Sequence, residues 1–187
     1  AYAGAFVQLG PSWPVVGVAL AVLAAAAALV WRWLGPHVGR LSAPVQACPG
    51  WDLRELVSHT GAVHRWATTA IDGGVAPATV EYSWPAPDAA GHELGEWLLD
   101  GADTLIASLT TRDPEDPTWH PFGLEQKVWV WARRQSQETM IHRWDAENAV
   151  GDPTPIEAGL ASDGVDEYFE IALPRIRRIC GLFRFGF

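Results

Sequence analysis

The chain has 187 residues, of which 49% are hydrophobic and 19% are charged, so it is long enough and apolar enough for one folded domain and is not a disordered segment. Its formal net charge of −9 argues against nucleic acid as a partner. Its two cysteines are too few for a disulfide framework in a domain of this size, so we expect a reducing, cytoplasmic setting.

The first predicted element covers residues 15–34, which contain one charge, Arg32, within a run rich in alanine, valine and leucine. A helix that is apolar all round must be buried in protein or in lipid. The length satisfies the minimum for a membrane span, and the nearby Trp13, Trp31 and Trp33 resemble interfacial anchors. We expect a helix of a bundle, with a membrane anchor as the alternative.

The second predicted helix begins after Asp52. The sequence Asp52-Leu53-Arg54-Glu55 is typical of a capping box, in which Asp52 caps the first turn and Glu55 reaches back. Apolar residues then recur at helical spacing as far as Gly73-Gly74, which predicts the end of the helix there. A proline-rich loop is expected over residues 77–87.

Three further helices are predicted, over residues 89–109, 125–149 and 156–173, and the last is limited by Pro174. No segment shows the alternation of a strand. The expected fold is therefore all-α: a four-helix bundle, antiparallel, with an apolar N-terminal helix and a short extra C-terminal helix.

We expect three regions along the chain. Residues 1–44 form the apolar helix and a linker, and residues 45–174 form the bundle domain. Residues 175–187 are an atypical basic and aromatic tail.

Four polar residues share one stripe of the helix predicted over residues 125–149. Gln135, Glu138, His142 and Asp145 recur at spacings of three and four, among apolar neighbours. A carboxylate and an imidazole in such surroundings need a partner. An i,i+4 hydrogen bond between Glu138 and His142, or a stripe that faces solvent, is the simple interpretation.

The alternative partner is a divalent metal. Two imidazoles and one carboxylate hold such an ion and leave other positions open. His59 lies at one edge of the apolar face of the second helix, and His64 lies at the other edge. Spacing alone leaves both as candidates for the third ligand beside Glu138 and His142.

Cys48 precedes Pro49-Gly50 at the entrance to the second helix. A thiolate could be favoured at such a position. We expect the more common role, a structural cysteine.

Two runs of sequence resemble a known family. The run from Cys48 to Trp66 resembles the opening motif of the mycothiol-dependent maleylpyruvate isomerase family, and the run from Glu138 to Glu147 resembles its second motif. The family belongs to the DinB-like four-helix metalloproteins, and the resemblance covers residues 43–174. The resemblance implies His59, Glu138 and His142 as metal ligands, with zinc or another divalent ion.

The resemblance also implies mycothiol as a thiol cosubstrate and a small electrophile as substrate. The chain would then be an isomerase or an S-transferase, with a thiolate stabilised by the metal as nucleophile. Asp145 is expected to orient the free ring nitrogen of His142, and a salt bridge from Asp145 to Arg143 or Arg65 is the alternative. Arg65, Arg133, Arg134 and Arg143 are candidates for binding a carboxylate of the substrate.

Two alternatives to the enzyme remain open at this point. The first is a DinB-like protein that binds metal without turnover. The second is a form of the domain anchored in a membrane by residues 15–34.

Overall fold

The computed structural model describes residues 38–76, 83–86 and 88–173. Within these ranges the chain forms a short 3-10 helix, η1 (Val38–Arg40), and three long helices, α2 (Leu53–Gly73), α3 (Gly91–Thr110) and α4 (Val128–Ala149). A short helix, α5 (Ala158–Glu167), continues into a π-helical turn, η2 (Tyr168–Ala172). Two isolated β-bridges occur in these ranges but no strand does, so the all-α prediction is confirmed.

Helix α2 begins where the capping residues predict. The Asp52 side chain accepts a hydrogen bond from the Glu55 N–H (3.0 Å), and Glu55 accepts one from the Asp52 N–H (2.9 Å). These two bonds satisfy N–H groups that have no partner within the helix. Gly74 ends the helix in the left-handed conformation, with a φ of 66°.

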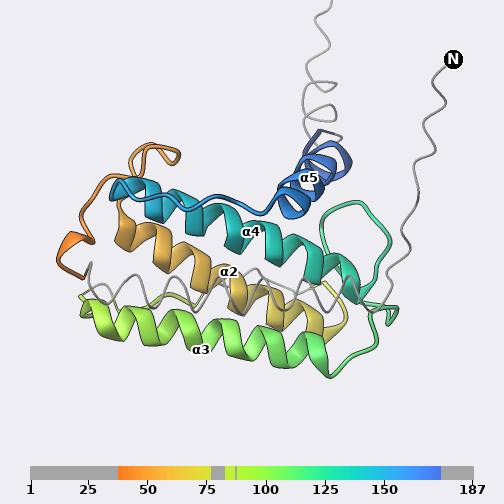
Figure 1. Cartoon of the computed structure of the whole chain (residues 1–187). Helices are drawn as coiled ribbons and strands as arrows, with labels where there is room; N and C mark the ends of the chain where they lie inside the picture. The colour runs from red at the N-terminus through yellow and green to blue at the C-terminus, as the bar shows by residue number, and fades with distance from the viewer. Residues whose placement is uncertain (1–37, 77–82, 87, 174–187) are drawn as a thin grey trace, which may run out of the picture.

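The three long helices pack side by side in a bundle (Figure 1), but their directions are mixed. Helix α4 runs antiparallel to α2, as predicted, because residues near the start of α2 pack with Ala146 near the end of α4. Helices α2 and α3 run parallel instead: Arg54 contacts Ala89, and Arg65 contacts Asp100 further along both helices. The connection over residues 74–90 is long enough to return along the bundle, whose helices are about 30 Å long at 1.5 Å per residue.

Among the described residues, the buried core has two apolar clusters, one toward each end of the bundle. One cluster joins the second half of α2 and α3 to the start of α4, around Trp131, which is fully buried. The other joins the first half of α2 and α3 to the end of α4, around Leu53 and Leu56. Buried polar side chains lie on α2 and α4 between the two clusters, among them Thr60, His64, Gln135 and Thr139.

After α4 the chain runs back along this helix to α5 (Figure 1). The return is fixed by Glu147, which accepts hydrogen bonds from the Thr154 N–H and hydroxyl, both at 2.7 Å. Arg143 donates to both oxygens of Glu147, at 2.9 and 2.8 Å. Beyond this turn, side chains of α4 at residues 133–137 bind Asp163 and Glu167 of α5 and hold α5 against α4.

Two predicted helices differ in detail from the structure. Helix α4 begins at Val128 rather than near residue 125, because Lys127 pairs with Pro117 in a β-bridge before the helix starts. The last predicted helix, over residues 156–173, is split into α5 and the π-helical η2, and Glu157 caps its start.

The predicted apolar helix at residues 15–34 and the tail at residues 175–187 lie outside the described residues. Among the helices of the described ranges, none combines the length and the apolar character that a bilayer crossing requires.

Candidate metal centre

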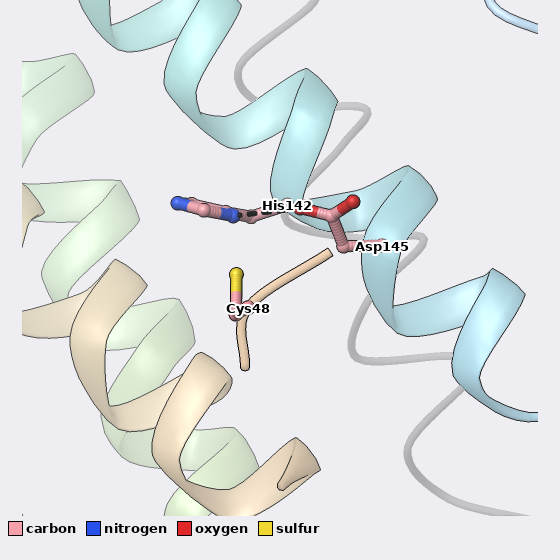
Figure 2. Close-up of side chains that lie close together, drawn as sticks. All are labelled: Cys48, His142 and Asp145. Carbon is pink, nitrogen blue, oxygen red and sulfur yellow. Dashed lines mark hydrogen bonds and ion pairs between the residues drawn. The ribbon is translucent and has the colours of Figure 1, made fainter. Parts of the chain in front are cut away.

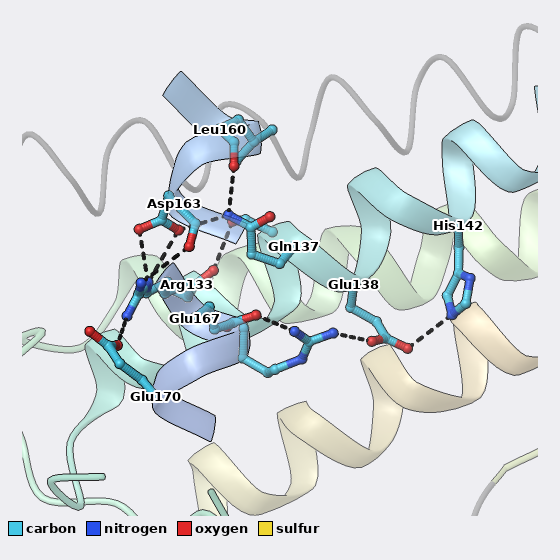
Figure 3. Close-up of polar contacts among 11 residues, drawn as sticks. Arg133, Gln137, Glu138, His142, Leu160, Asp163, Glu167 and Glu170 are labelled. Atoms are coloured by element: carbon cyan, nitrogen blue, oxygen red, sulfur yellow. Dashed lines mark hydrogen bonds and ion pairs between the residues drawn. The ribbon is translucent and has the colours of Figure 1, made fainter. Parts of the chain in front are cut away.

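His59, Glu138 and His142 lie together between α2 and α4. One potential ligand atom from each residue lies within 4.8 Å of the other two. The His59 Nε2 is 3.3 Å from the Glu138 Oε1, and the His142 Nε2 is 3.1 Å from the same oxygen. The i,i+4 spacing places Glu138 and His142 on one face of α4, and α2 supplies His59 from the opposite side (Figure 3 labels the two α4 residues). The structure thus brings together the three residues predicted as ligands.

The Glu138 carboxylate is mostly shielded from solvent, with a side-chain exposure of 16%. Burial alone would raise its pKa, but hydrogen bonds from His142 and His59 and the charge of Arg134 outweigh burial and lower the pKa of this carboxyl well below its usual range. Glu138 is therefore negatively charged at neutral pH, which is the form that binds a cation.

His142 is held on both sides. Its Nε2 faces Glu138, and its Nδ1 lies 3.1 Å from the Asp145 Oδ2. Burial would lower the pKa of His142, but the hydrogen bonds to Asp145 and Glu138 outweigh it and raise the pKa to about 9. Without a metal, the ring therefore carries a proton on each nitrogen. Loss of the Nε2 proton would leave the lone pair directed toward Glu138, with Asp145 still holding the Nδ1–H.

Asp145 lies at the position expected for the residue that orients His142. Its exposure is 5%, and His142 is its partner in both the hydrogen bond and the ion pair that the structure describes. The alternative partners are engaged elsewhere: Arg143 with Glu147 and Arg65 with Asp100.

His64, the rival ligand, points into the core instead. It is fully buried, and its Nε2 is 2.8 Å from the Thr139 hydroxyl oxygen. Burial lowers the pKa of His64 to about 4, so the ring is neutral at physiological pH. His64 does not belong to the groups of ligand atoms found in the described part of the chain.

Cys48 lies beside the site, which the sequence did not indicate. It belongs to the loop before α2, and Figure 2 shows its sulfur pointing toward the His142 ring. Potential ligand atoms of Cys48, His142 and Asp145 also lie within 4.8 Å of one another. Burial, and then the charges of Asp145 and Glu138, raise the pKa of the Cys48 thiol, which favours the thiol over the thiolate.

The loop that carries Cys48 is closed by backbone hydrogen bonds. The Val45 N–H donates to the Trp51 carbonyl (2.9 Å), and the Trp51 N–H donates to the Cys48 carbonyl (3.0 Å). The Trp51 ring lies against the His59 ring, with 4.9 Å between the ring centroids. No local sequence signal relates this loop to residues on α4, which are about ninety positions away in the chain.

The four candidate arginines are all engaged by residues of the bundle. Three of them contact groups outside the metal centre, and one contacts Glu138 directly. Their acidic partners are Asp100 for Arg65, Asp163 and Glu170 for Arg133, Glu138 and Glu167 for Arg134, and Glu147 for Arg143.

The donor set suits a divalent ion. It consists of two imidazole nitrogens and one carboxylate oxygen, a combination found in catalytic zinc sites that keep a position open. The side chain of His59 is 29% exposed, so solvent reaches this side of the site. The geometry therefore provides a candidate metal-binding group with one solvent-exposed side.

Comparison with known proteins gives a family. No curated protein and no solved structure gives a significant match. The model of the family described as "Mycothiol maleylpyruvate isomerase N-terminal domain" matches residues 22–147, about two thirds of the chain. The match contains His59, Glu138 and His142, and it begins within the apolar segment, earlier than the resemblance at residue 43 suggested. The chain belongs to the mycothiol maleylpyruvate isomerase N-terminal domain family.

Proposed function

We propose that this protein binds a divalent metal, with zinc as the first choice, through His59, Glu138 and His142, and that it uses mycothiol to act on small electrophiles. The observation that carries the proposal is the meeting of these three ligand atoms from two helices, in a chain of this family. The reaction class is an isomerisation or an S-transfer. A bound divalent ion would favour the deprotonated form of a thiol, which is the reactive nucleophile.

The protein's own groups prepare the site in two ways. Asp145 holds the Nδ1–H of His142, so the Nε2 lone pair is directed toward Glu138 and His59 once the second proton has left. Arg134 holds the Glu138 Oε2, which leaves Oε1 facing both imidazoles. The thiol would approach from the exposed side of His59, next to the Val45–Trp51 loop.

Metal binding without turnover is the second candidate, and one observation favours it. An open cavity of about 900 Å³ lies between α4 and α5, and its lining includes Met140, Ile141 and Tyr168. None of His59, Glu138 and His142 lines this cavity. This cavity is therefore separate from the candidate metal centre.

Metal analysis tests the binding part of the proposal. We expect the purified protein to bind one equivalent of zinc, and His59→Ala, Glu138→Gln and His142→Ala to lose it while keeping their helical circular dichroism. His92→Ala is the matched control, because His92 is an exposed histidine on α3. Zinc binding that is unchanged in all three ligand variants would refute the assignment.

A thiol assay separates the two candidates. Zinc-loaded protein is incubated with an activated alkene and either mycothiol or glutathione, with and without a chelator. Turnover that depends on mycothiol and is lost on chelation supports the enzyme. A zinc-loaded protein that gives no turnover with either thiol supports binding alone.

A further inference from the structure

The two oxygens of the Glu138 carboxylate have different partners. Oε1 faces His59 and His142, whereas Oε2 accepts a hydrogen bond from the Arg134 Nη2. The other terminal nitrogen of Arg134, Nη1, donates to the Glu167 Oε2. These contacts link Glu167 on α5 through Arg134 and Glu138 to His142, and Figure 3 labels Glu167, Glu138 and His142.

Glu167 is an unusual residue for the inner side of a short helix. It is 3% exposed, and its Oε1 has no hydrogen-bond partner among the described residues. Burying a carboxylate is costly unless a cation compensates for the lost hydration, and here Arg134 is that cation. Since each end of the planar guanidinium is bound to a different carboxylate, its orientation is fixed.

The Arg134–Glu167 pair is not the only contact that docks α5 on α4. Arg133 donates to Asp163 at 2.9 and 3.1 Å and also to Glu170. Gln137 donates to Asp163 at 2.7 Å. Of the three α4 side chains that bind α5 in this way, Arg134 is the one that also contacts a residue of the candidate metal centre.

We propose that Arg134 is a positioning residue for Glu138, and that Glu167 fixes it in place, so that a single carboxylate oxygen is presented to the metal. The inference rests on the proposed metal site. With Oε2 bound to Arg134, the carboxylate cannot turn freely and offers Oε1 on the side of the two imidazoles. Helix α5 thereby controls the geometry of a ligand that lies on another helix.

The choice of variant matters, because Arg134 has two opposite effects on metal affinity. Its positive charge weakens the binding of a cation, whereas its positioning of Glu138 is proposed to strengthen it. Removing Arg134 alone removes a positive charge near the site, which by itself would strengthen the binding of a cation. It would also leave Glu167 buried without a counter-ion. The double variant Arg134→Met/Glu167→Gln removes one charge of each sign, so that the loss of positioning is the main change.

The matched control is Arg133→Met/Glu170→Gln. This pair also joins α4 to the α5–η2 segment and also removes one charge of each sign, but neither residue contacts Glu138. Both double variants are checked for parent-like helical circular dichroism and thermal unfolding. The probe is Co²⁺, measured by competition with a chelator and by its visible absorption spectrum, which reports the ligand geometry.

We expect Arg134→Met/Glu167→Gln to bind Co²⁺ about 10- to 100-fold more weakly than the parent and with an altered spectrum, the size typical when a group that orients a ligand is lost. The control should keep the parent affinity and spectrum. Parent-like binding in the first variant, or an equal loss in both, would overturn the inference while leaving the proposed function intact. A parent protein that binds no Co²⁺ would instead refute the metal site itself, and this inference with it.

Discussion

If His142 is a metal ligand as proposed, its raised pKa should make metal binding depend steeply on pH. A metal ligand must offer a lone pair, so the Nε2 proton of His142 has to leave before the ion binds. With a pKa of about 9, only about one molecule in a hundred has lost that proton at pH 7. An unperturbed histidine would be about three-quarters neutral at the same pH.

The magnitude follows from these fractions. The cost of removing the proton at pH 7 is about 2.7 kcal/mol, since one pKa unit corresponds to about 1.4 kcal/mol. The apparent affinity for Co²⁺ should therefore rise about tenfold for each pH unit between pH 7 and 8.5, and level off above about pH 9. Glu138 remains ionised over this whole range and adds no slope.

The assay is a competition titration with a chelator whose own pH dependence is known, at several values between pH 6.5 and 9. Asp145→Asn is the informative variant, because the hydrogen bond to Asp145 is the largest of the effects that raise the pKa of His142. In this variant the plateau should begin at a lower pH. An affinity that is flat between pH 7 and 8.5 in the parent would refute this account of His142.

The raised pKa of His142 also predicts how the stability of the metal-free protein changes with pH. The pKa of His142 is raised in the folded state from an ordinary value of 6.5, so the proton stabilises the fold. This contribution, at most about 3.5 kcal/mol, is fully present below pH 6.5 and is lost as the pH rises through 9. The melting temperature of the metal-free protein should fall over that window.

Two predictions concern the scaffold. Asp52→Ala should lower the free energy of unfolding by about 1 kcal/mol in urea titrations, because the cap of α2 is lost, whereas Asp52→Asn, which keeps an acceptor, should cost less; equal losses would contradict the cap. Gly61→Ala should cost about 1–3 kcal/mol, because the new Cβ would lie 2.2 Å from the Trp97 ring. Gly73→Ala, in the same helix with nothing within 4 Å of its Cβ, is the control and should be neutral or stabilising.

Sequence patterns predicted the ends of a helix well where residues close in sequence determine them. Asp52, Glu55 and Gly74 fix both ends of α2 by hydrogen bonds and backbone conformation within a few residues. The start of α4 was missed because Lys127 is held by Pro117, a contact that no periodicity reports. The parallel direction of α2 and α3 was also missed, because a loop of that length permits either direction.

The metal centre was predictable in part. The i,i+4 spacing puts Glu138 and His142 on one face whatever the fold, and family resemblance supplied His59. Residue patterns alone could not choose between His59 and His64, since both lie at edges of the same apolar face and the rotation of α2 against α4 decides between them. The role we propose for Arg134 was hidden as well, because an arginine bound to a buried Glu167 has the same local sequence as an arginine on the surface.

The placement of the candidate ligands on two long helices, and of Cys48 and Trp51 on a separate loop, has an evolutionary consequence. Helical backbone hydrogen bonds hold the candidate ligands, so mutations in residues 45–50 can reshape the approach to this site while α2 and α4 keep the backbone positions of His59, Glu138 and His142. Related proteins could therefore diversify the small molecules that reach this site by exchanging that short loop while inheriting the same candidate ligands.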